Sequence, residues 1–133
     1  LDVGLACWLL GIRSSDVLSV HPSRGALFET LVVSEFLKQR FNLGRPADLY
    51  FWRDNSGLES DLLFESAGRL QTVEIKSGRT VTTDYVRAAQ KTSRVAPEEE
   101  VLDPWLIHGG EDTYVRNGVR VLGWNSFSKN DLC

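Results

Sequence analysis

The chain has 133 residues, 42% of them hydrophobic and 25% charged, with a formal net charge of −3. This length and composition predict one domain, residues 1–133, with its core over about residues 23–123, and the acidic balance excludes a nucleic-acid binder whose whole surface is basic. No apolar run approaches the roughly 20 residues of a membrane span, and no signal peptide is recognisable, so a cytoplasmic location is expected. The chain contains no Met and opens inside an apparent helix, which indicates a piece of a longer polypeptide.

Helix signals dominate the first third of the chain. Two short helices are expected over residues 3–10 and 14–19, packed beside the core. A long helix is expected over residues 23–41, because no Pro interrupts this segment and no Gly follows Gly25 until Gly44.

Six later segments have the composition of β-strands and are separated by turns that contain Gly or Asn. They are residues 48–53, 59–65, 70–76, 101–108, 113–115 and 119–122. The first three predict an antiparallel meander, and a helix over residues 82–94 is expected before the last three. An acidic run at 98–100 is expected to be a solvated loop or helix end. This order predicts an α/β domain, a mixed sheet covered by helices.

Two acids and a lysine are expected to meet on neighbouring strands. Side chains alternate along a strand, so Glu74 and Lys76 project to one side and the apolar residues flanking Glu74 to the other. A short turn brings Asp61 of the preceding strand beside Glu74. Two facing carboxylates repel unless a cation separates them, and Mg²⁺ or Mn²⁺ prefers such oxygen ligands. The alternative is a surface salt bridge between strands, which is the commoner outcome for these three residues alone.

The long helix supplies a further acid. At 100° per residue, Phe28, Val32 and Phe36 lie in one apolar arc, and Glu29 falls inside that arc. We therefore expect Glu29 to point into the protein. A buried carboxylate must be protonated, paired with a cation such as Arg53, or close to a metal.

A basic stripe is predicted on the helix over residues 82–94. Arg87, Lys91 and Arg94 recur at spacings of four and three, which aligns them along one helix face. Such a stripe can follow a phosphate backbone, so these are the candidate nucleic-acid-binding residues. The alternative is a solvated helix face.

Other conspicuous residues receive no chemical role. Trp52, Trp105 and Trp124 have strand-like apolar neighbours, so core or edge packing is expected for them rather than base stacking. Cys7 and Cys133 are isolated, so neither a zinc site nor a disulfide framework is expected.

Four ordered sequence blocks resemble a domain of unassigned function that follows the ATPase module of many prokaryotic AAA-type proteins. The blocks are GALFE at 25–29, YFWRD at 50–54, GLESD at 57–61 and VEIKSG at 73–78. That family is similar to the PD-(D/E)XK nucleases, which implies a restriction-endonuclease-like three-layer core: a mixed central sheet of about four to five strands flanked by helices. The resemblance also implies an upstream ATPase module in the same full-length chain, with any oligomer formed through that module.

The resemblance assigns roles to four residues. Asp61 takes the place of the first acid of the nuclease motif, Glu74 the second acid and Lys76 the lysine, whereas Ser60 stands where the motif has proline. Glu29 matches a helical acid that many members add as a metal or supporting group. The function implied is Mg²⁺- or Mn²⁺-dependent cleavage of DNA. The alternative is a catalytically inactive nuclease-fold module that serves DNA binding or protein interaction for the ATPase.

Overall fold

Three helices open the chain, which the computed structural model describes from residue 2 to residue 126. They are α1 (Val3–Leu9), α2 (Ser15–Val20) and α3 (Arg24–Asn42). The first two are each capped by a side-chain oxygen of the preceding residue, which satisfies an N–H of the first turn. All three predicted helices are confirmed to within one residue at each end. Within the described part of the chain, no helix is long and apolar enough to cross a membrane.

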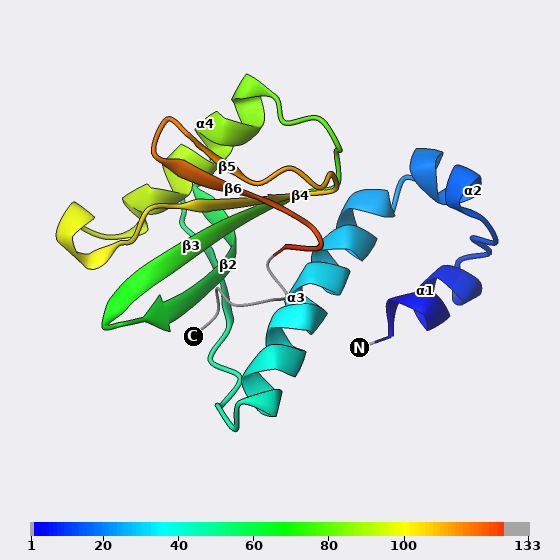
Figure 1. Ribbon diagram of the computed structural model, residues 1–133, viewed down its shortest axis with the longest axis horizontal. Helices are drawn as coiled ribbons and strands as arrows, with labels where there is room; N and C mark the ends of the chain where they lie inside the picture. Colours follow the sequence, from blue (N-terminus) through cyan, green and yellow to red (C-terminus); the bar gives the residue numbers. More distant parts are fainter. Residues whose placement is uncertain (1, 127–133) are drawn as a thin grey trace.

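A mixed sheet forms the middle of the molecule, with its strands in the order β1-β2-β3-β4-β6-β5 (Figure 1). The strands are β1 (Tyr50–Arg53), β2 (Glu59–Ser66), β3 (Arg69–Lys76), β4 (Trp105–His108), β5 (Tyr114–Arg116) and β6 (Val119–Gly123). β1, β2 and β3 pair antiparallel, which confirms the predicted meander. β3, β4 and β6 run parallel, so their carboxyl ends point to the same edge of the sheet.

The sheet has six strands rather than the four or five expected. The last pairing comes from β5, only three residues long, which forms an antiparallel hairpin with β6. The connecting residues Asn117 and Gly118 have positive φ angles of 52° and 74°. This conformation belongs to two-residue turns whose twist matches that of the flanking strands, so even a very short strand adds to the sheet edge.

Three predicted elements are shorter in the structure. The strand expected over residues 48–53 begins at Tyr50, after Asp48, whose positive φ of 33° is not an extended conformation. The strand expected over residues 101–108 begins at Trp105, because Pro104 has no N–H to donate to the ladder. The helix α4 (Thr83–Thr92) ends two residues before the prediction, and its last residue is held by a hydrogen bond from the Thr92 hydroxyl to Ala89 O. Arg94 consequently lies in the 3-10 helix η1 (Ser93–Val95). The acidic run forms an exposed 3-10 helix, η2 (Glu98–Glu100), as expected for a solvated segment.

α3 and α4 cover opposite faces of the sheet, which gives the molecule three layers (Figure 1). On the α3 face, Val32 and Phe36 pack against buried strand residues, and the rings of Phe36 and Phe64 have their centroids 5.6 Å apart. On the α4 face, Val86 and Ala89 pack against the strands: their buried partners are Leu106, Val119 and Val121. This arrangement confirms an α/β fold whose apolar side chains lie between layers.

Candidate active site

Asp61 lies in an irregular part of β2. Tyr50 faces Leu63 and Trp52 faces Ser60, so two residues of β2 lie opposite one residue of β1. This is the geometry of a β-bulge, which redirects a side chain locally. The Asp61 carboxylate is hydrogen-bonded to the neighbouring strand β3, where its Oδ2 accepts the backbone N–H of Ile75 at 2.7 Å.

Glu74 and Lys76 project from the same side of β3, as predicted. Lys76 Nζ lies 2.6 Å from Glu74 Oε1, a charge-assisted hydrogen bond between residues two apart on one strand. The Glu74 side chain is only 8% exposed, whereas that of Lys76 is 32% exposed. A buried acid therefore sits under a partly exposed lysine at the carboxyl end of the strand.

Glu29 does not point into the protein, contrary to the prediction from helical periodicity. Its side chain is exposed, because this turn of α3 lies at the margin of the core, where the sheet covers only part of the apolar arc. Arg53 is not its partner, since Arg53 Nη1 lies 3.8 Å from Glu59 Oε2. Glu29 still interacts electrostatically with Asp61 and Lys76, so α3 does bring its charge to the site.

The charged groups of the site shift one another's ionisation. Burial raises the pKa of Asp61, although the N–H of Ile75 acts against that shift. Burial also raises the pKa of Glu74, and the negative charge of Asp61 adds to it. For Glu29, partial desolvation and then the charge of Asp61 raise the pKa. Burial by itself lowers the pKa of Lys76, but the hydrogen bond and charge of Glu74 outweigh it and raise the pKa. The acids repel one another, and an added cation would relieve that repulsion.

The donor set of Asp61 and Glu74 suits a hard divalent cation such as Mg²⁺ or Mn²⁺. Each carboxylate keeps a second oxygen, Asp61 Oδ1 and Glu74 Oε2, beside the one already hydrogen-bonded. Mg²⁺ commonly takes one or two carboxylates and fills its other positions with water and phosphate oxygens. Among residues 2–126, no three His, Cys, Asp or Glu side chains are grouped as a metal-holding set. A metal here would rest on two carboxylates and waters, with Glu29 contributing its charge.

The predicted basic stripe is divided by the tertiary structure. Lys91 of α4 lines a hollow of about 330 Å³ together with Glu74, Glu59 of β2 and the β1–β2 connection at residues 56–58. Arg87 forms an ion pair of 3.5 Å with an acid of its own helix, and Arg94 lines a different hollow. All three side chains are exposed. Lys91 is therefore the stripe residue that shares a hollow with Glu59 and Glu74.

Glu59 was not predicted as part of the site. Its negative charge contributes to the raised pKa values of Glu29, Asp61 and Glu74. The sequence left Glu59 open: it lies two residues before Asp61 on the same strand, so alternation could place both acids on one face.

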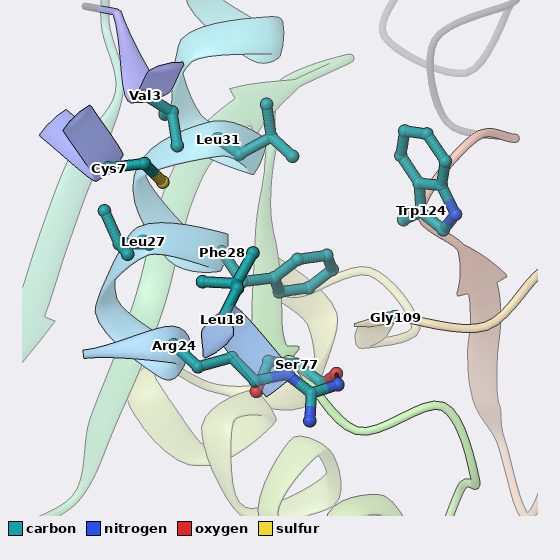
Figure 2. A pocket seen from close by; sticks show the side chains of 10 residues that line it. All are labelled: Val3, Cys7, Leu18, Arg24, Leu27, Phe28, Leu31, Ser77, Gly109 and Trp124. Atoms are coloured by element: carbon teal, nitrogen blue, oxygen red, sulfur yellow. Dashed lines mark hydrogen bonds between the residues drawn. The ribbon is translucent and has the colours of Figure 1, made fainter. Parts of the chain in front are cut away.

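A second, apolar hollow, formed where α3 meets the carboxyl ends of the parallel strands, was also not predicted (Figure 2). It has a volume of about 250 Å³, and Phe28, Trp124 and Arg24 contribute to its lining. Trp124 was expected in core or edge packing but is 44% exposed, whereas Trp105 is buried in the core. The lining comes from distant parts of the sequence, so no local pattern could have predicted it.

Asp61→Asn should raise the thermal stability of the protein at neutral pH, by roughly 3–5 °C in Tm. The asparagine oxygen can still accept the N–H of Ile75, while the buried negative charge is removed. Because the pKa of Asp61 is raised in the folded protein, its contribution to stability is full below the unfolded pKa and is lost as the pH rises through the folded pKa. The gain in stability from Asp61→Asn should therefore appear at pH values above the folded pKa of Asp61 and disappear at acidic pH. Thermal unfolding followed by circular dichroism across that pH range measures it.

Asp54 supplies a control, because its pKa is lowered in the folded protein whereas that of Asp61 is raised. The hydrogen bond from the Ser56 hydroxyl is the largest of several contacts that lower the pKa of Asp54. Asp54→Asn should therefore lose stability at neutral pH, and that loss should fade as the pH falls through the folded pKa. If Asp61→Asn is less stable than the wild type at neutral pH, the electrostatic account of the site is wrong.

Residues 24–127 of the chain match the family model described as "Domain of unknown function (DUF4143)". Two curated relatives, uncharacterised proteins of Mycobacterium tuberculosis and Mycobacterium bovis, are each 39% identical over 87 residues. The match covers 65% of this chain but 18% of each relative, so the chain spans less than a fifth of their length. No solved structure gives a significant match. Because the family model covers most of the sequence, the chain belongs to the DUF4143 family.

Proposed function

We propose that this domain is a Mg²⁺- or Mn²⁺-dependent phosphodiesterase that cleaves DNA. The observation that carries the proposal is the contact of 2.6 Å between Lys76 Nζ and Glu74 Oε1, with the redirected carboxylate of Asp61 on the adjacent strand. The three-layer fold with a mixed sheet is compatible with a restriction-endonuclease-like core. Perturbed pKa values concentrated in one cluster are typical of functional sites.

The chemistry assigns a task to each side chain. Hydrolysis forms a bond from a water oxygen to phosphorus and breaks one P–O ester bond, so negative charge develops on the phosphate and on the leaving oxygen. A bound divalent cation supplies Lewis acidity and lowers the pKa of water. Asp61 and Glu74 are the carboxylates that would hold the cation, and the ammonium of Lys76 would stabilise the charge on the phosphate. The exposed Glu29 accepts the proton of the water and releases it to solvent, which also supplies the proton taken by the leaving oxygen.

The DNA-cleaving domain would act within a longer protein. We expect an upstream ATPase module to load or remodel the DNA, with any oligomer formed through that module. The length of the relatives leaves room for such a module, since the match covers 18% of each. A cytoplasmic location is part of the same proposal.

A second candidate function is DNA or protein binding by a nuclease-fold module without catalysis. One observation favours it: the ammonium of Lys76 already neutralises Glu74, and in the described residues no set of three potential ligands surrounds a metal position. A structural ion pair would account for that contact by itself.

A metal titration combined with a plasmid-nicking assay separates the two candidates. The full-length protein with its ATPase module should bind Mg²⁺ or Mn²⁺ in isothermal titration and should nick plasmid DNA only when the metal is present. Binding of metal and DNA without any nicking, with ATP present or absent, would reject the phosphodiesterase and favour the binding module.

Replacing Arg87, Lys91 and Arg94 by Ala should reduce the salt dependence of DNA binding. Each lost phosphate contact lowers the slope of log K against log salt by about 0.9, so three contacts correspond to about 2.7. Lys91→Ala alone should account for about 0.9, because Lys91 lines the hollow that contains Glu74. Binding isotherms at several salt concentrations measure the slope.

Lys38→Ala is the matched control for the basic residues. Lys38 is an exposed helical lysine on α3 that forms an ion pair with Glu35, outside the hollow lined by Lys91. This variant should keep the wild-type slope. An unchanged slope in the triple variant would show that Arg87, Lys91 and Arg94 form only a solvated surface.

A further inference from the structure

We propose that the apolar hollow lined by Phe28, Trp124 and Arg24 binds one unpaired nucleobase of the DNA, next to the phosphodiester that is cleaved. This inference rests on the proposed function and specifies its substrate: DNA with an unpaired nucleotide at the cleavage site, as opposed to an intact duplex.

The position of the hollow in the fold favours a ligand site. Ser77 follows β3, Gly109 follows β4 and Trp124 follows β6, and all three residues line the hollow. These three strands are parallel, so the hollow lies at their carboxyl ends. In open α/β sheets, ligands bind in the crevice outside the carboxyl ends of the strands.

The hollow adjoins the proposed catalytic centre through two pairs of sequence neighbours. Ser77 lines the hollow and directly follows Lys76. Phe28 lines the hollow and directly precedes Glu29, whose charge acts on Lys76. The hollow therefore begins one residue along the chain from Lys76 and from Glu29.

The lining has the chemistry of a nucleobase site. Figure 2 shows the ring of Phe28 pointing from α3 towards the side where Trp124 stands, with the guanidinium of Arg24 beneath it. Aromatic rings offer flat apolar faces on which a base can stack. Arg24 donates to Ser77 O at 2.8 Å and to Ser19 O at 3.3 Å, which positions its guanidinium and leaves other N–H groups for a base edge or a phosphate.

The size of the hollow restricts the occupant. Its volume of about 250 Å³ is smaller than the roughly 300–1,000 Å³ of pockets for drug-sized ligands. At this scale we propose a single base, not a base pair, as the occupant. The base must therefore leave the stack or belong to a single strand, which costs least where it is already unpaired.

The test measures DNA binding without cleavage. A labelled single-stranded oligonucleotide and a blunt duplex of the same sequence are titrated, by fluorescence anisotropy, with the full-length protein in a metal-chelating buffer. Trp124→Ala should weaken binding of the single strand about 10-fold, since one stacked base is worth roughly that factor, and should leave the duplex affinity unchanged. Trp124→Phe should restore most of the affinity because it keeps a flat ring.

Two further variants test whether a loss of binding comes from disturbed packing or from the removal of any tryptophan. Phe28 packs partly against the core, so Phe28→Leu keeps apolar volume while it removes the ring, and it should weaken single-strand binding in the same way. Trp8→Ala is the matched tryptophan control, because Trp8 is 60% exposed on α1 and does not line the hollow. It should bind both DNAs as the wild type does.

The outcomes separate this inference from the proposed function. Suppose that the wild type nicks DNA but that Trp124→Ala and Phe28→Leu keep the wild-type affinity for the single strand, or lose affinity for single strand and duplex equally. The nucleobase site is then overturned, and the hollow fits an apolar group of a protein partner instead. If single-strand binding depends on Trp124 and nicking never occurs, the nucleobase site stands and the phosphodiesterase fails. Absence of any DNA binding rejects both.

Discussion

Lys76→Ala should reduce metal-dependent nicking of DNA by on the order of 10²–10³-fold, the usual loss when one charge-stabilising donor is removed from an active site. Lys76 is the partly exposed cation of the cluster, and its ammonium contacts Glu74 at 2.6 Å. Metal affinity should be retained, because removing this cation frees Glu74 Oε1. Lys76→Gln, which can still donate a hydrogen bond to Glu74, provides a second variant in case the alanine protein unfolds.

Asp61→Ala should also lose DNA nicking, but for a different reason. Asp61 is one of two proposed ligands, so its loss should weaken Mg²⁺ or Mn²⁺ binding in isothermal titration as well as abolish nicking. The pair of variants therefore separates metal binding from catalysis. Lys38→Ala, an exposed lysine of α3 paired with Glu35, should nick at the wild-type rate. Wild-type nicking by both Lys76 variants would remove Lys76 from the catalytic centre.

Phe36→Ala should lower the free energy of unfolding by about 3–5 kcal/mol, the usual cost of truncating a buried aromatic residue. Phe36 is 1% exposed, and its ring contacts that of Phe64 in the core between α3 and the sheet. The alanine would leave a cavity where α3 and the strands meet. Chemical denaturation monitored by circular dichroism measures the change.

Phe41→Ala is the matched control for this substitution. Phe41 lies on the same helix but is 60% exposed, so its truncation should change the free energy of unfolding by less than about 0.5 kcal/mol. Equal losses for the two variants would contradict the packing of α3 against the sheet.

Much of the secondary structure was accessible from the sequence because it depends on neighbours in the chain. The long helix α3 ends where Gly44 can adopt a positive φ, and its lack of internal Pro is a local property. The contact between Glu74 and Lys76 follows from the alternation of side chains along a strand. The bounds of the strands were less accurate: β4 begins at Trp105, four residues after the predicted start, because Pro104 has no N–H to donate to the ladder.

The surroundings of the candidate site depended on contacts between distant residues. Helical periodicity placed Glu29 in the apolar arc, but Glu29 lies at the margin of that arc, beyond the part of α3 that packs against the core, so its side chain is exposed. Helical spacing aligned three basic residues, but α4 ends before Arg94, and only Lys91 shares a hollow with Glu74.

The sequence by itself determined the order and approximate extent of the helices and strands and that Glu74 and Lys76 share a face, because backbone geometry repeats over a few residues. Only the tertiary structure decided that a bulge directs Asp61 onto the N–H of Ile75, and that Phe28 and Trp124 line one hollow. Those arrangements arise where strand ends and helices from separate parts of the chain pack together, and the packing of such layers is not encoded in any single local pattern.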